Sequence, residues 1–198
     1  MNGLLLIILA TLIYAAVHSL LASPGVKAWT ERCFGTAAKR WYRLAYNSFA
    51  VVSGLPILAL LYFLPDRLLY QIRFPWILLT ILGQLAGILI IVVGILQTDL
   101  WHFAGLRQVV EPEFDAPPMM ITDGLYGWVR HPLYTGGLLL IWLTPRMTVN
   151  LLTVFIVLTI YLLVGAKFEE NRLLHEFGNQ YREYQKRIPM LLPYRGRK

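Results

Sequence analysis

Two polar segments, Gly124–Gly137 and Lys167–Tyr184, carry the densest group of ionisable and hydrogen-bonding side chains in this chain. An arginine offers a planar fork of donors for a carboxylate or phosphate, and a histidine donates or accepts a proton near neutral pH. Together with a carboxylate and aromatic walls, such groups suit a zwitterionic ligand that has its own positive centre. The ionisable and hydroxyl candidates are Arg130, His131, Tyr134, Glu169 and Glu170. The candidate aromatic walls are Tyr126, Trp128, Tyr134 and Tyr181.

This group of side chains has two interpretations. Adjacent residues of a helix point about 100° apart, so we expect only one of Glu169 and Glu170 to face a pocket. In the first interpretation, Arg130 and that glutamate line a ligand site. In the second, they form an interfacial salt bridge that closes a helix bundle. The spacing alone supports both equally.

The composition predicts an integral membrane protein. The 198 residues are 57% hydrophobic and only 15% charged, with a mean hydropathy of +0.56, and a soluble surface needs more charge than this. The net charge is +7, but the basic residues cluster between apolar runs, which favours membrane topology and lipid headgroups over nucleic acid. The single cysteine, Cys33, excludes an intramolecular disulfide and a multi-cysteine metal site.

The apolar runs predict an all-α polytopic membrane helix bundle with about five transmembrane helices and a cytoplasmic C-terminal helical extension. A bilayer core needs about 20 apolar residues per helix. The expected spans are Gly3–Ala22, Asn47–Leu64, Pro75–Leu96, a thin arm at Leu133–Leu143, and Val149–Gly165. The expected connections are a basic loop at Ser23–Arg43, a short loop at Asp66–Phe74 and a long polar segment at Gln97–Val129. The extension carries one amphipathic stripe at helical spacing, formed by Leu173, Phe177, Tyr181 and Tyr184.

The charge distribution predicts the orientation and a division of roles. With the N-terminus outside and the C-terminus cytoplasmic, 15 of the 18 lysines and arginines fall on inside segments, as the positive-inside rule requires. Both polar segments then lie at the cytoplasmic face. We expect residues 1–104 to form a transmembrane scaffold of three spans and residues 105–198 to form the functional region.

The spacing of Gly83 and Gly87 allows two helices to approach closely. Packing within the monomer is the simpler interpretation, and a dimer contact is the alternative. The oligomeric state stays open.

No metal site is expected. The acidic run Glu111–Asp115 is interpreted as a solvated loop, because no histidine or further carboxylate stands beside it at a ligand spacing. A haem is disfavoured as well, because no two histidines are placed to ligate one iron from facing spans. The four histidines are His18, His102, His131 and His175.

The two polar segments together resemble the membrane-embedded methyltransferases, which include isoprenylcysteine carboxyl methyltransferase and the phospholipid methyltransferases. The resemblance is carried by RHPLYTGG, which begins at Arg130, and by FEENRLLHEFGNQYREYQKRIPMLLP, which begins at Phe168. The longer string GLYGWVRHPLYTGGLLLIWLTPRMTVNLL is most similar to the bacterial methanethiol S-methyltransferase branch. In the first third, HSLLAS and YRLAYN resemble NnrU-like membrane proteins. The resemblance is specific from Gly105 to Pro193 and weaker before that.

The resemblance implies methyl transfer from S-adenosylmethionine, bound at the cytoplasmic side between the loop and the C-terminal extension. It matches Arg130, His131, Pro132 and Tyr134 to the RHPxY cofactor segment of the family, and Glu169 and Glu170 to its paired glutamates. It matches Gly178, Tyr181 and Tyr184 to the helix that covers the cofactor. The expected cofactor-binding residues are Tyr126, Arg130, His131, Pro132, Tyr134, Glu169, Glu170 and Tyr181, and the expected catalytic residues are His131 and Glu170.

The implied acceptor is a small or lipophilic molecule, either a thiol or an isoprenylcysteine-like carboxylate. Lys167 departs from the eukaryotic carboxyl methyltransferase pattern, which weakens the case for a carboxylate. A thiol needs a base, for which His131 is the nearest candidate, and a hydrophobic acceptor is expected to enter from the bilayer past Leu133–Leu143. The branch implies a bacterial cytoplasmic (inner) membrane and contact with its lipids. The alternative function is a non-catalytic NnrU-like accessory protein of respiratory or denitrification metabolism.

Overall fold

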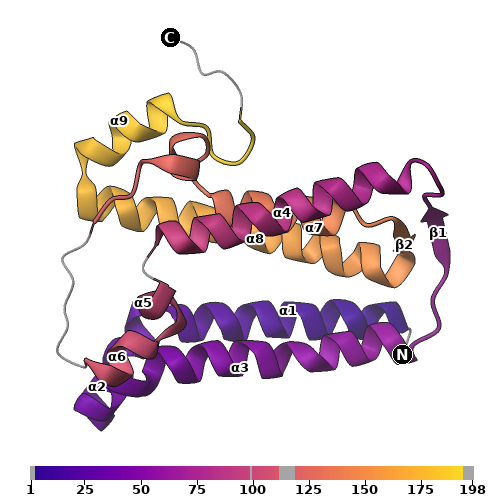
Figure 1. Ribbon diagram of the computed structural model, residues 1–198. Helices are drawn as coiled ribbons and strands as arrows, with labels where there is room; N and C mark the ends of the chain where they lie inside the picture. Colours follow the sequence, from indigo (N-terminus) through magenta and orange to yellow (C-terminus); the bar gives the residue numbers. More distant parts are fainter. Residues whose placement is uncertain (1–2, 99, 112–118, 194–198) are drawn as a thin grey trace. The chain divides into compact units, whose positions relative to one another are not determined.

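The computed structural model describes residues 3–98, 100–111 and 119–193 (Figure 1). Most of the expected acidic loop, Glu111–Asp115, lies outside these residues. Four of the described helices are long and apolar enough to cross a membrane: α1 (Gly3–Ala22), α3 (Thr36–Phe63), α4 (Ile77–Gln97) and α8 (Val149–Phe177). The protein is an all-α polytopic membrane protein, as the composition predicts.

The chain divides into two compact units, which we describe separately. Unit 1 comprises Met1–Arg67 and Asp99–Pro117, and unit 2 comprises Leu68–Thr98 and Pro118–Lys198. Helix α4, the third expected span, therefore packs in unit 2 together with both polar segments. The division of roles at residues 104 and 105 stays a prediction, because packing units do not report roles.

Unit 1 shows that the expected basic loop, Ser23–Arg43, is wrong. The Ser23 hydroxyl caps α2 (Pro24–Phe34) by accepting a backbone N–H in its first turn at 3.3 Å, and a proline occupies the first helical position. Gly35, at φ 55°, separates α2 from α3. Charged side chains weaken the apolar periodicity here, so only the cap and the proline could have revealed the helix.

Helix α3 also begins well before the expected span Asn47–Leu64. Its polar first half is held inside unit 1 by hydrogen bonds to two short helices. Arg40 Nε donates to the Val109 carbonyl at 2.7 Å, and Asn47 Nδ2 donates to the Ala104 carbonyl at 3.0 Å. The two short helices are α5 (Leu100–Ala104) and α6 (Leu106–Val110).

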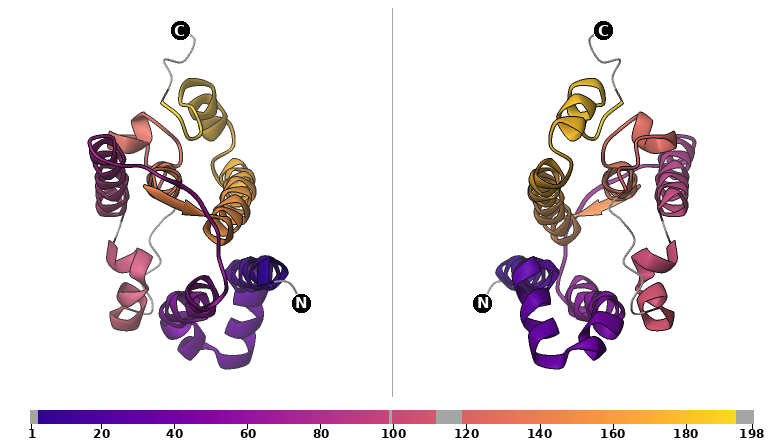
Figure 2. Two further views of the ribbon diagram at one scale, coloured as in Figure 1. Left: turned by 90° about the vertical axis from the view of Figure 1, so that its right-hand side faces the viewer. Right: turned by 90° about the vertical axis from the view of Figure 1, so that its left-hand side faces the viewer.

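Unit 2 is built on a helical hairpin that packs against α4. Its remaining elements are β1 (Leu68–Gln71), the 3-10 helix η1 (Gly124–Gly127), α7 (Pro132–Trp142), β2 (Arg146–Thr148) and α9 (Asn179–Arg187). Figure 2 shows α7 lying between α4 and α8. Strand β1 pairs antiparallel with β2, although Asp66–Phe74 is expected to be a plain loop. Strands this short carry too little alternation to be detected in a sequence.

Glycines allow α4 and α7 to approach closely. A Cβ added to Gly136 would lie 2.6 Å from the Gly87 carbonyl oxygen, and one added to Gly87 would lie 2.8 Å from the Gly136 carbonyl oxygen. A Cβ on Gly83 would meet the Leu143 side chain. The spacing of Gly83 and Gly87 therefore serves packing within the chain, as the simpler interpretation predicts.

Helices α7 and α8 form the expected hairpin with a short first arm. Helix α7 has only 11 residues, and its ends lie beside opposite parts of α4, Leu133 beside Gly94 and Leu143 beside Gly83. Helix α8 runs without interruption to Phe177, where Gly178 at φ 56° ends it. The expected amphipathic stripe is therefore divided between two helices, α8 and α9.

Candidate functional site

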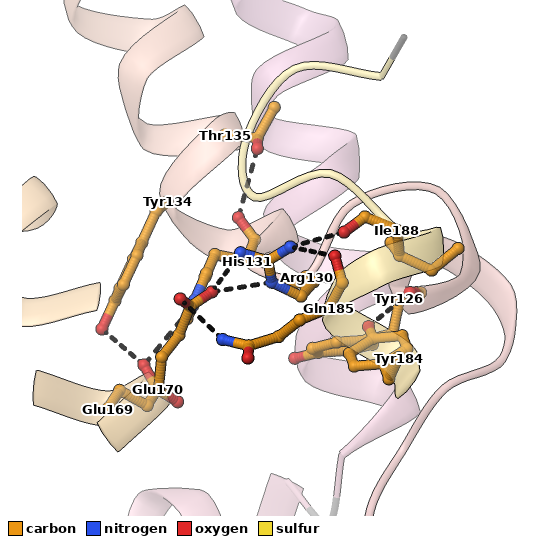
Figure 3. Close-up of polar contacts among 10 residues, drawn as sticks. All are labelled: Tyr126, Arg130, His131, Tyr134, Thr135, Glu169, Glu170, Tyr184, Gln185 and Ile188. Atoms are coloured by element: carbon orange, nitrogen blue, oxygen red, sulfur yellow. Dashed lines mark hydrogen bonds and ion pairs between the residues drawn. The ribbon is translucent and has the colours of Figure 1, made fainter. Parts of the chain in front are cut away.

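The site lies in unit 2, where η1, the start of α7, the last turns of α8 and helix α9 meet (Figure 3). Pro132, buried, occupies the first position of α7 and starts it directly after His131. Glu169 and Glu170 extend from α8 toward this turn. The two polar segments, far apart in the sequence, thus come together as expected.

Arg130 and Glu170 form a buried ion pair. Arg130 Nε and Nη2 lie 2.7 and 2.6 Å from Glu170 Oε1, and each side chain is only 11% exposed. Arg130 Nη1 donates to two further acceptors, the backbone carbonyls of Gln185 at 3.2 Å and Ile188 at 2.5 Å. The guanidinium is therefore engaged by the protein itself on three of its nitrogens.

His131 stands between the two glutamates. Its Nδ1 lies 3.5 Å from Glu169 Oε2 and its Nε2 lies 3.3 Å from Glu170 Oε1. The ring stacks on Tyr134, with centroids 5.2 Å apart and an angle of 3° between the planes. The side chain is only 5% exposed, so neither ring nitrogen is open to a ligand and the imidazole holds the two carboxylates in place.

Glu169 differs from its neighbour in exposure and in bonding. Its side chain is 37% exposed, and its Oε2 accepts a hydrogen bond from the Tyr134 hydroxyl at 3.0 Å. Within the described part of the chain, Glu169 Oε1 forms no hydrogen bond. The site therefore presents one carboxylate oxygen that a cationic ligand can approach.

Helix α9 closes one side of the site with two tyrosines. Tyr181 is buried, and the Tyr184 hydroxyl donates to the Tyr126 carbonyl at 2.5 Å. Burial raises the pKa of Tyr184 to about 12, and burial together with the nearby charge of Glu170 raises the pKa of Tyr181 as well. Both phenols stay neutral and able to donate over the physiological range.

The chain after α9 runs back along the start of α7. The amides of Arg130 and His131 donate to the carbonyls of Pro189 at 2.9 Å and Met190 at 3.1 Å. The Thr135 hydroxyl donates to the Leu191 carbonyl at 2.7 Å. We call residues 188–191 the C-terminal strap, because these bonds tie it across the turn that bears the site residues.

Three residues that position the site are absent from the sequence-based candidates. Gln97, at the end of α4, accepts from the Leu125 amide at 3.0 Å and so holds η1. Thr135 holds the C-terminal strap, and Gln185 donates to Glu170 Oε2 at 3.1 Å. Glutamine and threonine are common residues, and these three stand at no spacing that would predict a role in a site. In the sequence, the strap is marked only by the prolines near the end of the second motif, Pro189 and Pro193.

Most of the candidate residues meet at this site. Arg130, His131, Tyr134, Glu169 and Glu170 are directly bonded or stacked, Tyr126 takes part through its carbonyl, and Tyr181 is buried on α9. Trp128 is the exception, because it is 70% exposed. Trp128 takes part in none of these contacts among the described residues. The roles of the candidate residues toward a ligand stay predictions.

Comparison with known proteins identifies relatives along nearly the whole chain. The chain is 34% identical to a methanethiol S-methyltransferase of Crocosphaera subtropica, a match that covers 94% of this chain and 73% of the relative. It is 33% identical to the methanethiol S-methyltransferase of Pseudomonas deceptionensis, over 96% and 73% of the two chains. A human protein-S-isoprenylcysteine O-methyltransferase is 33% identical over 56% of this chain and 41% of its own.

No protein-family model matches the chain. No solved structure matches it either. The relatives named for methanethiol and those named for isoprenylcysteine are nevertheless all methyltransferases. This favours an enzyme over the accessory-protein alternative. An enzyme of this kind needs a methyl donor and an acceptor. The chain therefore belongs to the methanethiol S-methyltransferase family, and it is a membrane-embedded methyltransferase.

Proposed function

We propose that the protein transfers a methyl group from S-adenosylmethionine to a small thiol at the site around Glu169. The observation that carries this proposal is the carboxylate of Glu169, which is partly exposed and has one oxygen without a hydrogen bond in the described residues. Its neighbour Glu170 is neutralised by Arg130. A positive ligand is therefore attracted to one defined oxygen atom.

The residues fit such a cofactor. When bound, S-adenosylmethionine supplies a methyl group that passes to the acceptor sulfur, with the thiol proton released to solvent. Glu169 would offset the positive charge of the cofactor, and the partly exposed ring of Tyr134, which is hydrogen-bonded to Glu169, would supply an aromatic surface beside it. Tyr126, which is partly exposed, would extend this surface, and the buried Tyr181 would support it from α9.

His131 and Glu170 are better suited to positioning than to direct chemistry. Both ring nitrogens of His131 face carboxylates, so the imidazole has no free nitrogen with which to take a proton from a thiol. Glu170 is enclosed by Arg130, His131 and Gln185. Such residues hold the reacting groups in alignment, and alignment is what a methyl donor that is already activated mainly requires.

The thiol acceptor is proposed from the relatives, since the two bacterial proteins described above are named for methanethiol. We propose that the acceptor reaches the site from the bilayer along the short helix α7, while the polar cofactor enters from the cytoplasm. We also propose an N-terminus outside and a C-terminus inside, from the distribution of lysines and arginines, in a bacterial inner membrane. A lipophilic isoprenylcysteine analogue is the competing acceptor.

The proposal is tested by replacing the exposed carboxylate. Glu169→Gln in purified protein is expected to weaken S-adenosylmethionine at least tenfold and S-adenosylhomocysteine much less, because only the former carries a sulfonium charge. Calorimetric titration with both compounds measures the ratio. Glu176→Gln is the matched control, because Glu176 is an exposed carboxylate on the same helix.

Unchanged preference for S-adenosylmethionine in Glu169→Gln would contradict the assignment of this carboxylate. Failure of the wild type to bind either compound would contradict the cofactor itself. Transfer of a labelled methyl group to methanethiol or to an isoprenylcysteine analogue, measured side by side in detergent, identifies the acceptor.

A further inference from the structure

Gln185 links the covering helix α9 to the charged centre of the site. Its Nε2 donates to Glu170 Oε2 at 3.1 Å, and its backbone carbonyl accepts from Arg130 Nη1 at 3.2 Å (Figure 3). One residue of α9 therefore contacts both members of the buried ion pair.

Glu170 depends on this donor for one of its two oxygens. Its Oε1 accepts from Arg130 and lies 3.3 Å from His131 Nε2. Among the residues that the structure describes, Oε2 accepts a hydrogen bond only from Gln185. A buried carboxylate oxygen without a donor is strongly unfavourable. The hydrogen bonding of Glu170 is therefore complete only while α9 is docked.

Several other bonds of α9 and of the strap do not involve Glu170 directly. Tyr184 donates to the Tyr126 carbonyl, and the strap accepts from backbone amides and from Thr135. Ile188, directly after α9, accepts from Arg130 alone, whereas Gln185 hydrogen-bonds to both members of the Arg130–Glu170 pair.

On the basis of the proposed function, we propose that Gln185 is a positioning residue that couples the docking of α9 to the Arg130–Glu170 pair and thereby sets the affinity for the cofactor. Its amide donates to Glu170, and Glu170 in turn keeps Arg130 and His131 in place. Glu169, held by His131 and Tyr134, then stays aimed at the ligand. Gln185 itself need not touch the cofactor.

The first test replaces the amide by an acid of the same shape. Gln185→Glu removes the donor and brings a second carboxylate against Glu170, so the affinity for S-adenosylhomocysteine is expected to fall about tenfold to hundredfold. Gln180→Glu is the matched control, because it makes the same change at an exposed position of α9. It should leave the affinity within about twofold of wild type, since exposed charges interact weakly.

The second test exchanges the two partners. Glu170→Gln combined with Gln185→Glu restores a carboxylate–amide pair with the roles reversed, so the double variant is expected to bind more tightly than the product of the two single effects predicts. Such coupling is the mark of a direct contact. Single effects that simply multiply, or a Gln185→Glu variant that binds like wild type, would overturn the proposal.

Limited trypsin digestion measures the docking of α9 without any ligand. Arg182 is exposed on α9, and cleavage after it should be faster in Gln185→Glu than in Gln180→Glu if α9 undocks. Equal cleavage rates would show that Gln185 does not hold α9, even if the protein bound no S-adenosyl compound at all. The failure of this inference is thus distinguishable from failure of the proposed cofactor.

Discussion

The two ends of the α7–α8 hairpin are joined by different chemistry. At the β2 end, the chain itself turns from α7 into α8, and this turn is held against the segment that precedes α4. Strand β1 pairs with β2, the Ile72 amide donates to the Pro145 carbonyl at 2.8 Å, and the Tyr70 hydroxyl donates to the Thr144 carbonyl. At the other end, the joining uses a buried ion pair, Arg130 with Glu170. Neutral hydrogen bonds are thus sufficient to fix the hairpin at the β2 end.

The difference argues that the charges at the site end do more than close the bundle. Burying an ion pair carries a desolvation cost that neutral pairing avoids. We propose that the two interpretations of the sequence, structural bridge and ligand site, are divided between neighbouring residues. Glu170 forms the bridge with Arg130, and we propose that Glu169, which is partly exposed, serves the ligand.

The largest effect is expected from removing the bridge at the site end. Glu170→Ala leaves Arg130 buried without its carboxylate, which costs about 3–5 kcal/mol of stability, and should abolish binding of S-adenosylhomocysteine while the protein still inserts. Calorimetry and a membrane-extraction assay measure the two outcomes. Retained affinity would show that the bridge does not support the site.

The matched change at the other end is Tyr70→Phe. It removes one exposed hydroxyl contact of 3.3 Å, so stability should change by less than about 1 kcal/mol and methyl transfer should stay at the wild-type rate. An equal loss of stability and methyl transfer in Tyr70→Phe and Glu170→Ala would show that the two ends do not differ in this way.

An intermediate effect is expected at the helix contact that lies between the two ends. Gly136→Ala places a methyl group 2.6 Å from the Gly87 carbonyl oxygen and 2.7 Å from Ile91 Cγ1, so α4 and α7 must separate at a cost of about 1–3 kcal/mol. Gly137→Ala is the control, because nothing lies within 4 Å of that position. Thermal unfolding in detergent should separate the two neighbours, and similar melting temperatures would mean that the helices are not in close contact there.

The smallest effect concerns pH. Burial raises the pKa of Tyr184 to about 12, whereas an exposed tyrosine titrates near about 10. Because the folded pKa is the higher one, the contribution of this phenol to α9 docking is fully present below about pH 10 and is lost as the pH rises toward 12. Difference absorbance of wild type against Tyr184→Phe should show one phenol that ionises late. A difference spectrum that titrates near pH 10 would contradict the buried hydrogen bond to Tyr126.

Much of the helical framework could be predicted, because an apolar run of about 20 residues is typical of a helix that crosses a membrane. The runs at Gly3–Ala22 and Val149–Gly165 are helical as expected, and the thin arm is the short helix α7. The errors lie where charge or brevity hides the pattern. The helix within Ser23–Arg43 is polar, and the strands β1 and β2 are too short to show alternation.

The sequence by itself determined the class of the protein, most of its helical spans and the charged and aromatic candidates for the site. These follow from local composition and from motifs whose members are close in the chain. The tertiary structure decided which glutamate is enclosed and which is accessible, and it revealed Gln97, Thr135 and Gln185. Adjacent residues on α8 cannot be ranked by sequence, because their surroundings come from α7 and α9, and only folding brings those helices together.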